Sequence, residues 1–316
     1  MTERLGFTEI DYFKNFNMGR ELEISGEFIY ESAIKMNCLS YIGNHFEVNT
    51  ILYNGSVGIE RLQKILLCMY MKSSQEVTSP LKCFTKHNHI ELHTAINKRL
   101  KVPADKNILC LLEVFRRYYD DFRYAEYQLS YKEKELCELL INFIDKRIGV
   151  SLSLDYPNNE NDYLKMKSFY INLLGKIALL YFRAIRNKAE ELNLFTYEID
   201  SFSNAMKIFY RQDDEKLYDV LQTENYALKE LIIYLKKTKK QTNFLKYLRS
   251  FEPLDFDAVL IPEYLTDIVK YKSSTLLNDF VESIYSDFDS KQLRERKELL
   301  DLMSSNQVIW EDFILD

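Results

Sequence analysis

The chain has 316 residues, more than one hydrophobic core usually organises, so two domains are expected. Its composition, 47% hydrophobic and 28% charged, is typical of a globular protein and excludes a disordered one. The net charge is −6, but residues 251–316 carry −9 and residues 1–250 carry +3. An acidic C-terminal part argues against nucleic-acid binding by the whole surface and leaves room for a basic site in the first 250 residues.

Only 8 glycines and 5 prolines are present, too few for the turns of an all-β fold, so we expect an all-α protein. Apolar residues recur every three to four positions along most of the chain, as on one face of a helix. We expect helices over residues 25–40, 56–71, 88–100, 107–128, 131–148 and 161–194, and further ones over about 200–211, 213–222, 225–249, 263–288 and 290–304.

Two positions suggest helix ends. Asn88 has the features of an N-cap, with Glu91 three residues later, and Gly149 is a natural helix stop. Residues 150–161 contain the turn-forming sequence Asp-Tyr-Pro-Asn-Asn. We therefore predict a helical bundle over residues 1–150 and a second helical domain, of unknown role, over residues 151–316.

Cysteine usage indicates the compartment. The five cysteines are odd in number and form no closely spaced pair, so we expect free thiols in a reducing compartment. The N-terminus has no basic segment followed by an apolar run, and the longest uninterrupted apolar stretches are too short to span a bilayer. We expect a cytoplasmic protein that does not contact membranes.

The chemistry-bearing residues gather around residue 87. Three of the four histidines, His87, His89 and His93, fall within seven residues, beside Lys82 and Lys86. A helix beginning at Asn88 would place imidazoles beside free backbone N–H groups at its positive end, a geometry that binds anions. A histidine there stays neutral and can act as a general base while Lys86 holds a phosphate. The pattern fits phosphodiester chemistry without a metal or other cofactor.

Two other interpretations of the same cluster remain open. The histidines can be no more than a solvated helix start. Alternatively, Cys83, His87, His89 and His93 offer thiolate and imidazole ligands for a metal ion, although no tight pair of cysteines completes the set.

Two segments carry a family resemblance. Residues 58–67 (GIERLQKILL), a polar loop and residues 86–92 (KHNHIEL) resemble the HEPN superfamily, whose members often show a glycine-hydrophobic-glutamate-basic-leucine helix followed by a basic-histidine helix start. The resemblance covers roughly residues 20–150. It implies a helical bundle of toxin–antitoxin, abortive-infection or CRISPR-associated proteins. It also implies metal-independent cleavage of RNA at a dimer interface.

The sequence departs from the family at one point. Active members place an arginine before a histidine with four to six residues between them, and no arginine stands so here. Lys82 before His87 and Lys86 before His93 keep the spacing with lysine, which lacks the bidentate fork suited to phosphate. An arginine from elsewhere can take the role, and the candidates that we consider are Arg99, Arg116 and Arg123.

Charged residues elsewhere are better explained structurally. Arg116, Arg117, Asp120 and Asp121 have the spacing of ion-pair ladders on one helix. The basic run at residues 236–240 has aromatic neighbours and could follow a nucleic-acid backbone, but a solvated helix face is the simpler interpretation.

The sequence therefore favours an RNA-cleaving or RNA- or nucleotide-binding protein of bacterial antiphage defence or growth arrest. His87, His93 and Lys86 would be catalytic, and Lys82, His89 and Arg99 would bind phosphate or RNA. The resemblance also favours a homodimer and an antitoxin-like protein partner. The rival is a non-catalytic helical scaffold or regulator that binds a protein partner.

Overall fold

A computed structural model describes residues 7–79, 84, 87–154, 158–211, 216–269, 274–305 and 308–311. Within these ranges the regular structure is helical and no strand occurs, which confirms the all-α prediction. The chain divides into two compact units, Met1–Gln222 and Thr223–Asp316. The division expected at residue 150 therefore falls inside the first unit, because the helix after it packs into the same core.

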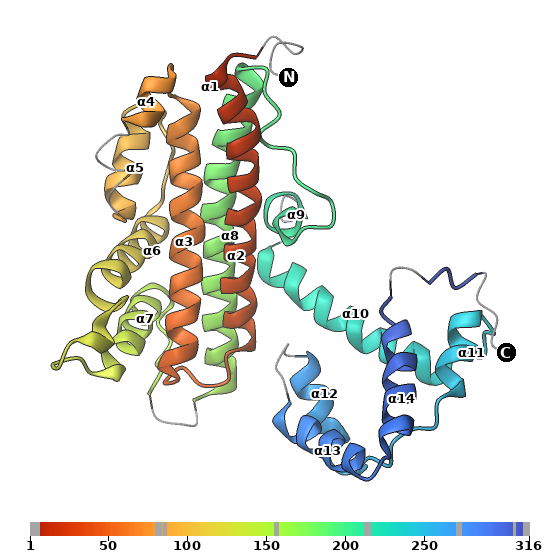
Figure 1. Ribbon diagram of the computed structural model, residues 1–316. Coiled ribbons are helices and arrows are strands. Elements are labelled where there is room, and N and C mark those ends of the chain that lie inside the picture. Colours follow the sequence, from red (N-terminus) through yellow and green to blue (C-terminus); the bar gives the residue numbers. More distant parts are fainter. Residues whose placement is uncertain are drawn as a thin grey trace. The chain divides into compact units, whose positions relative to one another are not determined.

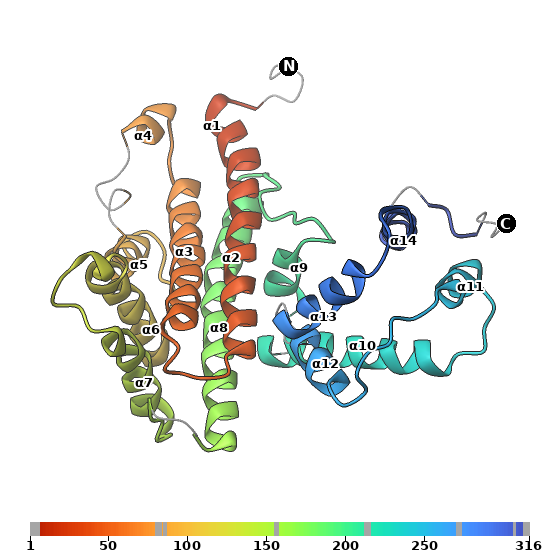
Figure 2. The ribbon, with the colours of Figure 1, turned by 60° about the horizontal axis from the view of Figure 1, so that its bottom comes forward.

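The first unit is built on three long helices. Helices α2 (Met18–Cys38), α3 (His45–Met69) and α8 (Glu160–Glu191) lie side by side in both views of the ribbon (Figures 1 and 2). Helices α2 and α3 begin 7 and 11 residues before the predicted segments, because buried apolar residues such as Leu22, Val48 and Ile51 extend the core-facing stripe beyond them. The long helix predicted near residues 161–194 is confirmed within a few residues at both ends.

Shorter helices complete this unit. They are α1 (Glu9–Tyr12), a π-helical turn (Phe13–Asn17), α4 (Ser74–Thr78), α5 (His89–Asn97), α6 (Lys106–Arg117), a second π-helical turn (Tyr118–Phe122), a 3-10 turn (Ala125–Tyr127), α7 (Glu133–Ile148) and α9 (Asn204–Phe209). The helix expected over residues 107–128 thus loses its α-helical hydrogen bonding at Tyr118. Gly149 ends α7 in the left-handed conformation, with φ of 64°, as predicted.

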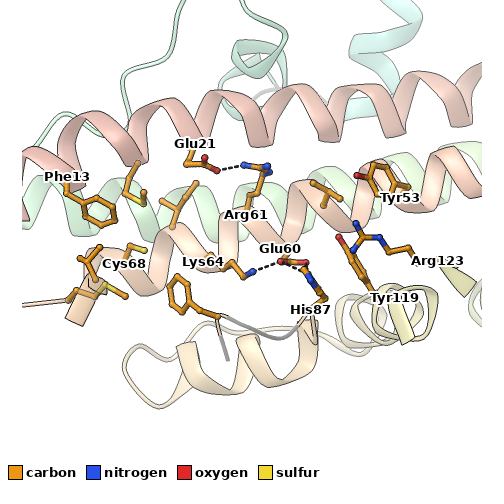
Figure 3. Close-up of a pocket in the computed structure, with 16 residues that line it drawn as sticks. Phe13, Glu21, Tyr53, Glu60, Arg61, Lys64, Cys68, His87, Tyr119 and Arg123 are labelled. Atoms are coloured by element: carbon orange, nitrogen blue, oxygen red, sulfur yellow. Dashed lines mark hydrogen bonds and ion pairs between the residues drawn. The ribbon is translucent and has the colours of Figure 1, made fainter. Parts of the chain in front are cut away.

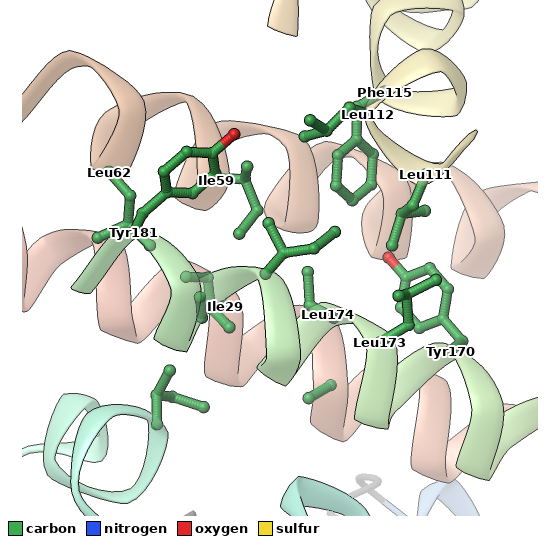
Figure 4. Packing of buried hydrophobic residues seen from close by; sticks show 14 of the residues in the cluster. Ile29, Ile59, Leu62, Leu111, Leu112, Phe115, Tyr170, Leu173, Leu174 and Tyr181 are labelled. Atoms are coloured by element: carbon green, nitrogen blue, oxygen red, sulfur yellow. The ribbon is translucent and has the colours of Figure 1, made fainter. Parts of the chain in front are cut away.

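Buried apolar side chains from all three long helices meet at the centre of this unit. Figure 4 shows Ile29 of α2, Ile59 and Leu62 of α3, and Leu174 of α8 packed together, with Phe115 of α6 beside them. The described residues contain one helix, α8, that is long and apolar enough to cross a membrane, and 61% of its most apolar 18-residue stretch is buried inside the protein. That burial is typical of the core helix of a soluble protein.

The second unit contains α11 (Asn243–Ser250), α12 (Ile261–Val269), α13 (Thr275–Ser286) and α14 (Ser290–Leu302), together with most of α10 (Leu217–Lys237). Aromatic contacts organise it: Trp310 packs against Phe244 and Tyr247, and Phe256 stacks on Phe280. The hydroxyl of Tyr247 donates to the backbone oxygen of Leu299 at 2.5 Å, which ties α11 to α14.

Candidate functional site

One cavity of about 560 Å³ lies within the first unit, along one face of α3. Tyr53, Val57, Glu60, Lys64 and Cys68 recur at helical spacing and form its floor. Figure 3 shows how side chains from the segments around α3 close over them. The remaining lining residues are Phe13, Met18, Glu21, Arg61, Ile65, Met71, Val77, Phe84, His87, Tyr119 and Arg123.

Glu60 is the charged group at the middle of this cavity. Its side chain is 8% exposed and accepts from Nζ of Lys64 at 2.5 Å, and its other oxygen lies 3.0 Å from Nδ1 of His87. Burial by itself would raise the pKa of Glu60, but the hydrogen bonds from Lys64 and His87 and the charge of Lys64 outweigh it and hold that pKa below its usual value. Glu60 is therefore a carboxylate at neutral pH.

His87 is the more exposed member of the pair that it forms with Glu60. Its side chain is 49% exposed, and its ring stacks on that of Tyr119 with centroids 4.7 Å apart and planes 5° from parallel. A carboxylate facing Nδ1 favours the tautomer that carries the proton there, which leaves Nε2 to accept a proton. Among the described residues Nε2 has no hydrogen-bond partner. The pair has the chemistry of a carboxylate-oriented general base.

His89 and His93 lie in the core, and their predicted exposure is wrong. His89 is fully buried, and its Nδ1 lies 3.2 Å from Oε1 of Gln63. His93 is 5% exposed, with Nδ1 2.8 Å from the hydroxyl of Tyr181 and Nε2 2.9 Å from the amide of Asn97. Burial lowers the pKa of both imidazoles, that of His89 to about 4. Neither ring lines the cavity, since α5 turns both toward α3 and α8.

The start of α5 differs from the expected anion site. Asn88 is the N-cap, as predicted, and its side-chain oxygen accepts from the backbone N–H groups of Ile90 and Glu91 at 3.1 and 3.0 Å. These two donors are consequently occupied by the protein itself. The helix start therefore offers less to a phosphate than the sequence suggested.

The cationic candidates are dispersed. Lys82 and Lys86 lie outside the described residues. Arg99 is exposed near the far end of α5, where Nη1 donates to the backbone oxygen of Ala95 at 3.3 Å, and it does not line the cavity. Of the arginines considered as replacements for the family's arginine, Arg116 is paired with Glu113 and Asp120, whereas Arg123 lines the cavity.

The three histidines take different partners, so they do not converge as metal ligands. His87 faces Glu60, His89 faces Gln63 and His93 faces Tyr181. Across the described part of the chain no three His, Cys, Asp or Glu side chains gather closely enough to hold a metal ion. Cys83, the thiol of the alternative metal set, lies outside that part.

The remaining charged motifs are structural in the described residues. Arg116 pairs with Asp120 and Arg117 with Asp121, as the ladder predicted, although Glu113 pairs with Arg116 rather than with Arg117. In the basic run, the lysines at 236, 237, 239 and 240 are exposed. Arg249 of α11 donates to the backbone oxygens of Thr238 and Lys240, which ties the segment after α10 to α11.

Sequence reasoning missed Tyr119 as a lining residue and considered Arg123 only as a replacement for the family's arginine. Tyr119 lies in the π-helical turn after α6 and Arg123 directly follows that turn, where helical periodicity breaks. Glu60 had a signal: it is an acid within an otherwise apolar helix stripe. No family model, curated protein or solved structure matches the chain. The HEPN assignment therefore stays a prediction from residues 58–67 and 86–92.

Proposed function

We propose that this protein is a metal-independent ribonuclease, or an RNA- or nucleotide-binding protein, in which His87 is the general base. The observation that supports the proposal is the pairing of buried Glu60 with half-exposed His87 at a cavity of about 560 Å³. Sites for small organic ligands and nucleotides commonly have volumes of roughly 300–1,000 Å³. Of the histidines expected to be catalytic, His87 is the one with access to this space, so we withdraw His93 from the chemistry.

The proposed step is an internal transesterification. Nε2 of His87 takes the proton of a ribose 2′-hydroxyl, the 2′-oxygen attacks the adjacent phosphorus, and the bond to the 5′-oxygen breaks. The products are a 2′,3′-cyclic phosphate and a 5′-hydroxyl, whose proton comes from solvent. Glu60 stabilises the imidazolium that forms, and Lys64 keeps a positive charge beside the reacting phosphate. Lys86 remains a proposed phosphate ligand.

The test is cleavage of a fluorescently labelled single-stranded RNA in the presence of excess EDTA. We expect His87→Ala to abolish cleavage. His45→Ala is the matched control, because Nδ1 of His45 also faces a glutamate, Glu133 at 3.8 Å, but His45 does not line the cavity. Equal cleavage by wild type and His87→Ala would remove His87 from the mechanism, and a requirement for added metal would remove the metal-independent reaction.

The biological setting follows from the family resemblance alone. We propose a cytoplasmic role in antiphage defence or growth arrest, with a homodimer assembled through residues 85–125 and an antitoxin-like protein as possible partner. Sedimentation tests the dimer: an interface of this kind should bury at least about 1,000 Å² and persist at micromolar concentration. A strict monomer with and without RNA would exclude a composite site.

A second candidate function is that of a protein-binding scaffold. The observation that favours it is an exposed face of α10, where Leu231, Tyr234 and Leu235 lie at helical spacing and are 51%, 43% and 41% exposed. Exposed apolar surface of this kind often marks a protein contact. Replacing Leu231 and Leu235 with glutamate should abolish any assembly made through this face, as measured by sedimentation, and unchanged assembly would exclude it.

A further inference from the structure

The cavity is elongated, and RNA cleavage by His87 uses only its middle. Its floor runs on α3 from Tyr53 to Cys68, and 15 residues of α-helix span about 22 Å. Figure 3 shows Phe13 and Cys68 at one end, Tyr53 and Arg123 at the other, and Glu60 between them. The two ends therefore have distinct surroundings.

The acids that line the cavity are already neutralised. Glu21 forms an ion pair with Arg61, and Glu60 is held by Lys64 and His87. The one lining cation left over is Arg123: among the residues that the structure describes, its guanidinium makes no ion pair and no hydrogen bond. The cavity thus has one uncompensated positive charge, at one end.

Arg123 is held in place by aromatic rings. Its Cζ lies 4.7 Å from the ring centroid of Tyr119, 5.1 Å from that of Tyr124 and 5.7 Å from that of Tyr53. These contacts with three rings restrict the guanidinium without using its N–H groups as hydrogen-bond donors, so those donors can bind a ligand. A planar fork of donors suits a carboxylate, phosphate or sulfonate oxygen pair. This end is a preorganised anion receptor.

The opposite end is apolar. Phe13 lies there beside Cys68 (Figure 3), and Met71 follows Cys68 by three residues. The cavity's other apolar lining residues include Met18, Val77 and Phe84. The thiol of Cys68 is there as well, and burial raises its pKa to about 12, so it adds no charge. Such a surface favours a hydrocarbon or aromatic group over a hydrated one.

We propose that this cavity binds a small amphipathic organic anion, with its charged group on Arg123 and its apolar body along α3 toward Phe13. Such a ligand lies over Glu60 and His87 and therefore competes with RNA for the site. Nucleotides and acyl or aromatic carboxylates share this chemistry. The inference rests on the cavity and on Arg123, and it holds whether or not the protein cleaves RNA.

The experiment uses 8-anilinonaphthalene-1-sulfonate, a fluorescent aromatic anion, titrated into the full chain without RNA and checked by calorimetry for one site per chain. Arg123→Gln should weaken binding at least tenfold, because it removes the charge and the fork. Arg294→Gln, at an exposed arginine of α14 that does not line the cavity, is the matched control and should change affinity less than twofold. Thermal melting verifies that each variant is folded.

Arg123→Lys is the second variant and keeps the charge without the fork, so its affinity should fall between those of the wild type and Arg123→Gln. Competition with decanoate and with uridine 2′-monophosphate distinguishes an acyl from a nucleotide ligand. Absence of saturable binding, or the same affinity in the wild type and both Arg123 variants, would overturn the proposal. Because no RNA is present, either result is independent of the cleavage assay, so the two ideas can fail separately.

Discussion

Nδ1 of His87 lies 3.0 Å from a carboxylate oxygen of Glu60, which stands 27 residues earlier, on α3. The buried carboxylate fixes the direction of the imidazole and its tautomer, and the stacked ring of Tyr119 fixes its plane. A surface histidine without such support would sample many orientations. This restraint is what distinguishes His87 from a solvated side chain at a helix start.

Glu60→Gln tests that support. A glutamine oxygen still accepts from Nδ1 but no longer stabilises an imidazolium, so we expect RNA cleavage to fall by roughly 10–100-fold, comparable to the loss of other groups that orient a functional histidine. The same change leaves Lys64 without its carboxylate, which should cost about 1–3 kcal/mol in the free energy of unfolding. Cleavage at the wild-type rate in a folded Glu60→Gln protein would show that His87 acts without Glu60.

Alanine substitutions should separate the histidines by their burial. His93→Ala removes a buried ring, leaves a cavity and deprives the hydroxyl of Tyr181 of one of its two hydrogen-bond partners, so we expect a loss of about 2–4 kcal/mol. His87→Ala removes a half-exposed ring and should cost no more than about 1 kcal/mol. Urea denaturation measures both.

Asn88→Ala is the calibration for this pair, because loss of its two cap hydrogen bonds should cost about 1 kcal/mol. If His87→Ala proves as costly as His93→Ala, then His87 is a structural residue, and its proposed role as a general base loses its basis.

The sequence predicted the helical class and most helices, because their apolar stripes face one core. It also predicted the cap at Asn88 and the stop at Gly149, since both depend on local backbone geometry. It did not predict which histidines are buried. That outcome depends on how α5 packs. His89 contacts Gln63 of α3 and His93 contacts Tyr181 of α8, and these two partners lie far from α5 in the sequence.

The cavity could be predicted only in part, for the same reason. Glu60 and Lys64 are one turn apart on α3, and local spacing predicted their pairing. His87 precedes α5, and Arg123 follows the π-helical turn after α6, so no helical periodicity connects either residue to that face of α3. Contacts of this kind follow from chain topology, which a single sequence does not supply.

Buried His89 should make the protein sensitive to acid. Burial lowers its pKa to about 4 from the ordinary 6.5, so the unfolded chain binds this proton first as the pH falls. The contribution of neutral His89 to the free energy of unfolding is therefore fully present above about pH 6.5, and it is lost progressively as the pH falls toward 4. Between pH 7 and pH 5 the loss from His89 should be about 2 kcal/mol. The lowered pKa of His93 acts in the same direction.

Urea unfolding at pH 7, 6 and 5 measures this loss, and His89→Gln should make the dependence on pH shallower even where it lowers stability at every pH. The carboxylates with lowered pKa, such as Glu60 and Asp105, act at lower pH, so they contribute little in this window. An equal dependence on pH in the wild type and His89→Gln would show that His89 is not the titrating group.

The last prediction concerns Gly58, where α3 packs directly against the backbone of α2. A Cβ at Gly58 would lie 2.6 Å from Cγ1 of Ile29 and 3.1 Å from the backbone oxygen of Ser25. Ile29 is fully buried and cannot move aside without displacing the core. We expect Gly58→Ala to destabilise the protein by about 1–3 kcal/mol, although alanine favours a helix by about 1 kcal/mol.

Gly19→Ala is the matched control within a helix of the same bundle. Its nearest neighbour would be the backbone oxygen of Thr196 at 3.7 Å, an ordinary contact, so the helix preference of alanine should prevail and stability should hold or rise by up to about 1 kcal/mol. Thermal and urea unfolding of the two variants measure the contrast. If Gly58→Ala were as stable as Gly19→Ala, the two helices would have to be farther apart at Gly58 than the structure places them.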